Sequence, residues 1–198
     1  MSKINSIIPP RNFEAARNRV CEILTDELAN QYALTQNESI NTSVWMERTN
    51  PFNHTELSAI NVCLSNASYA NKHAGSLDGV YAFNIDAFTI SKSNASGPGD
   101  IASSIKCQQL LGLCQAILEN PVFKTLGFVP GFVKRVYTTT LNMASPDKDD
   151  SLNSMWGRLI VNVELNESTP LINAPLISGY ETSVKLELTD KGYLYKSS

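Results

Sequence analysis

Residues 79–94, GVYAFNIDAFTISKSN, alternate apolar and polar side chains along most of their length. One phase is apolar throughout: Tyr81, Phe83, Ile85 and Ala87. The other phase carries Asn84 and Asp86. A period of two residues is typical of a strand with one buried face. This segment therefore predicts a long strand with one side in a core.

Two shorter alternating segments precede it, TSVWMER (42–48) and SAINVCLSN (58–66). The connection between them, Thr49 to Glu56, contains Asn50, Pro51 and Asn53, which favour turns. Because short connections favour antiparallel neighbours, we predict a hairpin with residues 49–56 as its loop.

Two more strands are expected after residue 130, in VKRVYTTTLNM (133–143) and MWGRLIVNVELNE (155–167). In the second, Leu159, Val161, Val163 and Leu165 share the apolar phase. The charged run SPDKDD (145–150) between them is typical of a hairpin tip. A last alternating segment, TSVKLELTD (182–190), follows a turn-rich stretch that begins at Ser168.

Helical periodicity occurs in two places. Residues 10–30 put one apolar stripe on a helix: Phe13, Ala16, Val20, Ile23, Leu24 and Leu28. Residues 100–119 carry a wider apolar arc: Ile101, Ile105, Leu110, Leu113, Cys114 and Ile117. Pro121 ends this second helix, because the residue before a proline resists the helical conformation.

These elements predict an α+β fold: an antiparallel, curved sheet of about five strands, plus a C-terminal strand, with two α-helices packed on one face. The sequence has no repeated βαβ pattern, which would have favoured a parallel sheet. We place a domain at residues 1–167 and a C-terminal extension with one strand at 168–198.

Composition narrows the function classes. The chain has 198 residues, 16 Lys+Arg and 19 Asp+Glu, for a net charge of -3. This charge does not suit nucleic-acid binding by broad phosphate neutralisation. The longest apolar run, LLGLCQAIL, is too short for a bilayer span, and the N-terminus does not resemble a secretory signal. We therefore expect a soluble protein made in a cytoplasm, without membrane association.

The clearest catalytic pattern is His54 and Glu56, which have the H-x-E spacing that opens the zinc-deaminase signature. The signature also needs a P-C-x-x-C pair, and the sequence contains no C-x-x-C. A hydrolase or deaminase using His54, Glu56 and Asp78 stays open as an alternative, but we expect no catalytic residue, metal or cofactor.

The other polar residues of interest have patterns that are common on protein surfaces. GPGD (97–100) lacks a phosphate-loop pattern, so it is interpreted as a helix start. Asp147, Asp149 and Asp150 would suit a cation only within a cleft. Lys134 and Arg135 could meet an acidic partner or DNA. Aromatic residues near strand ends, among them Phe52, Tyr193 and Tyr195, suit either a core or an interface.

The stretch VWMERTNPFNHTELSAINVCL (44–64), with a helix upstream, resembles the first hairpin of tail-terminator (tail-completion) proteins of long-tailed bacteriophages. That family joins two strands by a polar loop that often has an acidic residue before L-P-A; here Ser58 replaces the proline. The turn ENPVFKTLGF (119–128) and the strand GRLIVNVEL (157–165) extend the similarity over residues 10–167.

The resemblance implies a structural virion protein, assembled in the host cytoplasm. It would form a ring, commonly of six copies, on the head-proximal end of the tail. The ring would stop polymerisation of the tail tube, and of the sheath if present, and join the tail to a head-completion or stopper protein, while DNA passes through without sequence-specific binding. Another neck component (stopper, adaptor or head-completion ring) and a host-interaction binding module are the alternatives.

This function would place subunit or partner contacts in loops, strand edges and the C-terminal extension. The candidate contact residues are Asn50, Phe52, His54, Glu56, Lys134, Arg135, Asp147, Asp149, Asp150, Tyr193 and Tyr195.

Overall fold

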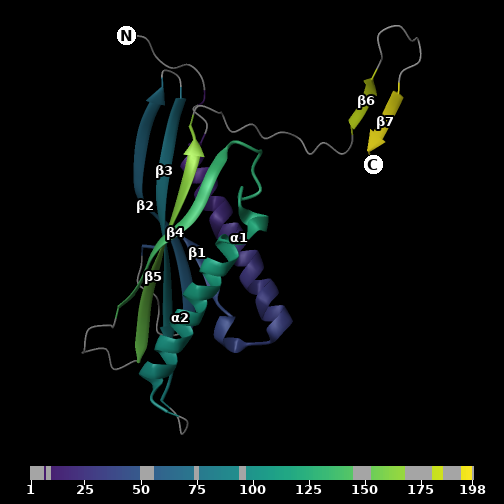
Figure 1. Ribbon diagram of the computed structural model, residues 1–198. Coiled ribbons are helices and arrows are strands. Elements are labelled where there is room, and N and C mark those ends of the chain that lie inside the picture. The colour runs from purple at the N-terminus through teal and green to yellow at the C-terminus, as the bar shows by residue number, and fades with distance from the viewer. Residues whose placement is uncertain are drawn as a thin grey trace.

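The structure, a computed structural model, describes residues 7, 10–49, 56–73, 76–93, 97–144, 153–167, 180–184 and 193–197; for 71–73, 76–77, 180–184 and 193–197 it describes the backbone alone. Figure 1 shows two helices on the same face of an open sheet. The elements are α1 (Asn12–Thr35), η1 (Glu38–Ile40), β1 (Ser43–Met46), β2 (Ser58–His73), β3 (Ser76–Ile90), α2 (Gly99–Leu118), η2 (Pro121–Phe123), β4 (Val133–Ala144) and β5 (Ser154–Asn166).

The five strands have the order β1-β2-β3-β5-β4. β3 lies at the centre and pairs antiparallel with β2 and β5, and β5 pairs antiparallel with β4. The predicted α+β class, with two helices on one face of a mostly antiparallel sheet, is therefore confirmed.

The predicted hairpin between the first two strands is wrong. β1 pairs parallel with β2, with Ser43 beside Ala59 and Met46 beside Val62. Because β1 and β2 run in the same direction, the chain must return from the end of β1 to the level of its start before β2 begins. The connection of about a dozen residues, 47–57, is long enough for such a crossover. Turn-forming residues within it indicated a reversal but could not specify the strand direction.

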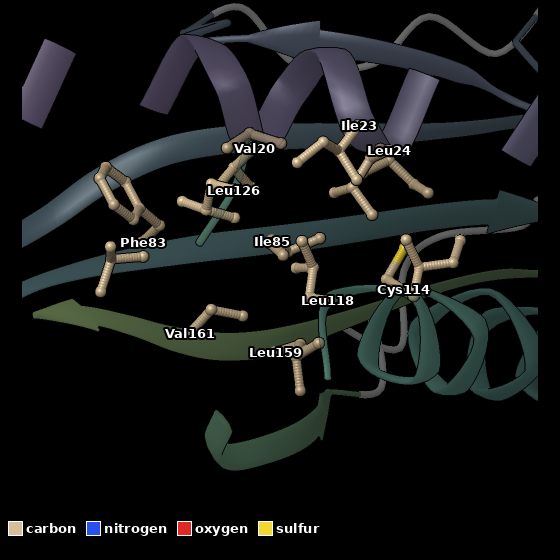
Figure 2. Close-up of a cluster of buried hydrophobic side chains, with 14 of the residues drawn as sticks. Val20, Ile23, Leu24, Phe83, Ile85, Cys114, Leu118, Leu126, Leu159 and Val161 are labelled. Atoms are coloured by element: carbon tan, nitrogen blue, oxygen red, sulfur yellow. The ribbon is translucent and has the colours of Figure 1, made fainter. Parts of the chain in front are cut away.

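The core lies between the helices and the sheet (Figure 2). Val20, Ile23 and Leu24 of α1 face the sheet, as predicted, and are almost fully buried. The apolar phases predicted for β3 and β5 are buried in the same layer; they include Phe83, Ile85, Leu159 and Val161.

The face predicted for the first half of the second helix is wrong. Ile101 and Ile105 are 55% and 51% exposed, whereas Ser103 and Cys107 are buried. Thr89 Oγ1 donates to the Ser103 carbonyl (2.8 Å), and the Cys107 thiol lies 3.6 Å from the Ala87 carbonyl oxygen. These polar contacts with β3 turn the start of the helix so that its small side chains face the sheet. The predicted burial of Leu110, Cys114 and Ile117 is confirmed.

In the C-terminal region, two short strands, β6 (Tyr180–Val184) and β7 (Tyr193–Ser197), pair antiparallel in a separate sheet. The sequence predicted one strand there, at 182–190. Residues 185–192 lie outside the described part of the chain.

Candidate subunit interface

Each side of the five-stranded sheet ends in an edge strand, β1 at one side and β4 at the other. From β1 to β4 the successive pairings are parallel, antiparallel, antiparallel and antiparallel. Three reversals of direction make β1 and β4 run in opposite directions. An unpaired edge presents backbone N–H and C=O groups that can bind another strand.

At the β1 edge, one contact shows which residues point their backbone N–H and C=O groups toward β2 and which point them outward. The Glu47 N–H donates to the Val62 carbonyl at 2.9 Å, which places the backbone groups of residue 47 on the β2 side. Since these groups alternate along a strand, those of Trp45 also face β2, and those of Val44 and Met46 point away from the sheet.

At the β4 edge, the phase follows in the same way. The Asn166 N–H donates to the Phe132 carbonyl at 2.9 Å, so even-numbered residues of β5 point their backbone groups toward β4. Leu141 lies opposite Leu159, an odd-numbered residue. This pair is therefore not hydrogen-bonded, and the backbone groups of Leu141 point away from the sheet.

Two hollows lie between α1 and the β1 edge. The smaller, of about 270 Å³, is lined by Asn18, Cys21, Glu22, Thr25, Asp26 and Met46. The larger, of about 410 Å³, is lined by Thr25, Leu28, Ala29, Tyr32, Asn41, Thr42, Ser43, Val44 and Trp45. They share Thr25 and together form a groove along the helix, which we call the α1–β1 groove.

The lining of the groove is more apolar than polar. The buried Thr42 Oγ1 has no hydrogen-bond partner among the described residues. Tyr32 donates its hydroxyl proton to Glu38 (2.7 Å), a hydrogen bond that raises the pKa of Tyr32 and lowers that of Glu38. Burial raises the pKa of the Cys21 thiol, so this cysteine is a weak nucleophile in the groove.

Three of the predicted contact residues have described side chains, and each has a partner within the subunit. Glu56 accepts hydrogen bonds from Arg48 Nη1 at 2.9 and 3.0 Å. Lys134 Nζ donates a hydrogen bond to Asp78 Oδ1. The Arg135 guanidinium lies 4.5 Å from the centre of the Tyr137 ring.

The other predicted contact residues have no described side chains. Asn50, Phe52, His54, Asp147, Asp149 and Asp150 lie outside the described residues. Tyr193 and Tyr195 lie on β7, opposite Val184 and Thr182, and only their backbone is described.

The structure does not bring Glu56 and Asp78 together. Glu56 precedes the end of β2 that pairs with Thr89, and Asp78 lies at the far end of β3, roughly 35 Å away at ~3.3 Å per residue. Among the described residues, no group of three His, Cys, Asp or Glu side chains could hold a metal ion.

The sheet face opposite the helices carries a polar cluster at its centre. Asn61 binds the backbone of Arg48, accepting from its N–H and donating to its carbonyl, each at 3.0 Å. Asp86 and Arg158 form an ion pair beside it. Asn84 is 7% exposed, and its Oδ1 has no partner among the described residues. Burial and then the charge of Asp86 raise the pKa of Cys63 to about 11, which favours an inert thiol.

The sequence analysis missed the residues at the two edges, notably Met46 and Leu141, which are 44% and 41% exposed. Met46 shares the apolar phase of its segment with Val44, and the sequence indicated a strand around Leu141 without marking its buried face. Only the strand order makes them edge residues.

No family model matches this chain, and no curated protein matches it. Among the described helices, none is long and apolar enough to cross a membrane.

Proposed function

We propose that this protein is a structural virion protein that forms a ring at the head-proximal end of a phage tail. The ring ends polymerisation of the tail tube, and of the sheath where the tail has one, and binds the head-completion or stopper protein. DNA passes through the ring without sequence-specific contacts. We expect six copies in the ring.

The observation that carries the proposal is the pair of edges with opposite strand directions. A contact between two different surfaces of the same chain is head-to-tail, and such contacts close into a ring when the rotation between copies divides a full turn. The two edges are different surfaces of this kind.

The proposed position of the protein in the virion is inferred from a sequence resemblance. The helix, the two strands around residues 44–64 and the turn at 119–128 resemble tail terminators. The catalytic alternative lacks comparable support, because Glu56 binds Arg48 and Asp78 binds Lys134 at distant parts of the sheet.

Native mass spectrometry and negative-stain electron microscopy of the purified protein, alone and with isolated tail tubes, would test the proposal. We expect a ring, or a monomer that becomes a ring on the tube, bound at one end of the tube and preventing its growth. Binding to the head vertex but not to the tube would indicate a stopper or adaptor instead. A monomer that leaves tube growth unchanged would refute the proposal.

A further inference from the structure

We propose that the ring closes by strand addition: β4 of one copy pairs antiparallel with β1 of the next, with Leu141–Ala144 opposite Ser43–Met46. The partner for both edges is thus a second copy of this chain. The inference rests on the proposed function, because a closed ring is what requires a head-to-tail contact.

The register follows from the rows of the sheet together with a ring axis that we place along the strands. Ser43 lies in one row with Ala59, Phe88, Trp156 and Ala144. Met46 lies in one row with Val62, Ile85, Leu159 and Leu141. A ring whose axis runs along the strands has no rise between copies, so these rows continue into the neighbour. Met46 then faces the neighbour's Leu141, and Ser43 faces its Ala144.

The direction and the hydrogen-bond phase both match in this register. β1 and β4 run in opposite directions, so copies related by rotation about such an axis pair antiparallel. The backbone groups of Met46 and Leu141 both point outward, as an antiparallel hydrogen-bonded pair requires. An antiparallel β1 would run in the same direction as β4 and would not allow this pairing. The parallel placement of β1 therefore makes the two edges complementary.

The side chains match as well. Met46 and Leu141 both belong to the helix-side phase, and both are exposed in the single subunit, at 44% and 41%. Leu141 of the neighbour would enter the smaller hollow of the α1–β1 groove, which Met46 lines. Burying these two apolar side chains in the contact removes apolar surface from water, which favours the pairing.

The helix layer leaves room for this contact. Two packed helices about 10 Å apart cover roughly four strands that are ~4.8 Å apart, so a fifth strand is left partly uncovered. α1 packs on β1 and β2, and α2 packs mainly on β3 and β5. In the proposed ring, α1 of the next copy covers the apolar side of β4 beside Leu141.

Cysteine cross-linking tests the register. In a background with Cys21→Ser and Cys63→Ser, the variant Met46→Cys/Leu141→Cys should form disulfide-linked oligomers up to the ring size under oxidising conditions, because paired residues lie about 5.5 Å apart between Cα atoms. The matched control is Ser43→Cys/Leu141→Cys in the same background. Its residues would be three rows apart, roughly 10 Å, and should not cross-link.

Each outcome decides the proposal. Cross-linked dimers from Met46→Cys alone or Leu141→Cys alone would indicate like edges paired about a two-fold axis and would overturn it. Rings that cap tails without cross-linking in the double variant would overturn the register but leave the proposed function intact. Cross-linked rings that do not bind tails would support the pairing and refute the proposed function.

Hydrogen exchange of the unmodified protein gives a second test that does not depend on variants. The amides of Val44, Met46, Leu141 and Met143 should exchange at least tenfold more slowly in the assembled protein than in dilute monomer. Equal exchange in both states, or failure to assemble even with tail tubes present, would overturn the pairing.

Discussion

Arg158 on β5 binds Asp86 on β3 through two parallel hydrogen bonds across the sheet, from Nε to Oδ1 (2.6 Å) and from Nη2 to Oδ2 (2.8 Å). The Asp86 side chain is 11% exposed and the Arg158 side chain 33%. The guanidinium also lies 4.8 Å from the centre of the Trp156 ring. The hydrogen bonds with Asp86 raise the pKa of Arg158 above its ordinary high value, so the guanidinium stays charged.

Replacing Arg158 by Ala should destabilise the fold, because it leaves the Asp86 carboxylate largely buried without its main partner. We expect the free energy of unfolding to fall by about 2–3 kcal/mol, below the usual range for a fully buried pair, since Arg158 is one-third exposed. Urea denaturation monitored by circular dichroism measures the change.

The matched control removes both charges. Asp86→Asn/Arg158→Met should be more stable than Arg158→Ala, because no uncompensated charge remains. If Arg158→Ala unfolds at the same urea concentration as the unmodified protein, the ion pair does not stabilise the sheet.

Most strands and helices could be predicted because each has one apolar face over many residues. In β3, the phase of Phe83 and Ile85 alternates with that of Asn84 and Asp86, and only a strand gives this period. The direction of β1 could not be predicted in this way. An alternating pattern identifies a strand but does not fix which neighbour it pairs with or in which direction.

The candidate interface was harder to predict from the sequence for a related reason. Polar residues such as Lys134 and Glu56 suggested contacts, but each binds a partner within the subunit. Leu141 is an apolar residue within a predicted strand, and its exposure depends on β4 being an edge strand. Edge position is a property of the strand order, which arises from long-range pairing.

The orientation of α2 in the structure predicts that alanine substitutions at two apolar residues of this helix will differ in their effect on stability. Ile105→Ala should change the free energy of unfolding by less than about 0.5 kcal/mol, because Ile105 is 51% exposed. Leu110→Ala should cost about 2–5 kcal/mol, because Leu110 is fully buried in the core. Thermal unfolding of both variants would check this, and equal losses would contradict the orientation of α2.

Gly157 permits the close approach of α2 to β5. A Cβ at this position would lie 2.7 Å from Leu111 Cδ1, 2.8 Å from Met143 Sδ and 3.1 Å from Cys107 Sγ. Gly157→Ala should therefore lower the free energy of unfolding by about 1–3 kcal/mol through overpacking. Gly112, within α2, has nothing within 4 Å of such a Cβ. Gly112→Ala should instead raise stability by about 0.5–1 kcal/mol, and a loss of stability there would contradict the open space around it.

The buried thiols predict a loss of stability in alkaline solution. Burial raises the pKa of Cys114 from about 9 to about 12. The folded pKa lies above the unfolded one, so the unfolded chain releases the thiol proton first as the pH rises. The stability due to the protonated thiol is therefore complete below pH 9 and is lost as the pH rises from 9 to 12.

A variant at this position isolates the effect of one thiol. Between pH 8 and pH 10, the unmodified protein should lose about 1.4 kcal/mol more stability than Cys114→Ala, because other ionising groups are common to both proteins. Urea denaturation of each protein at the two pH values gives this difference. Cys21→Ala is the control: burial raises the pKa of Cys21 as well, but its side chain is only partly buried, so the difference should be smaller. If Cys114→Ala shows the same pH dependence as the unmodified protein, the Cys114 thiol ionises as readily in the core as in the unfolded chain, which its burial between α2 and the sheet should prevent.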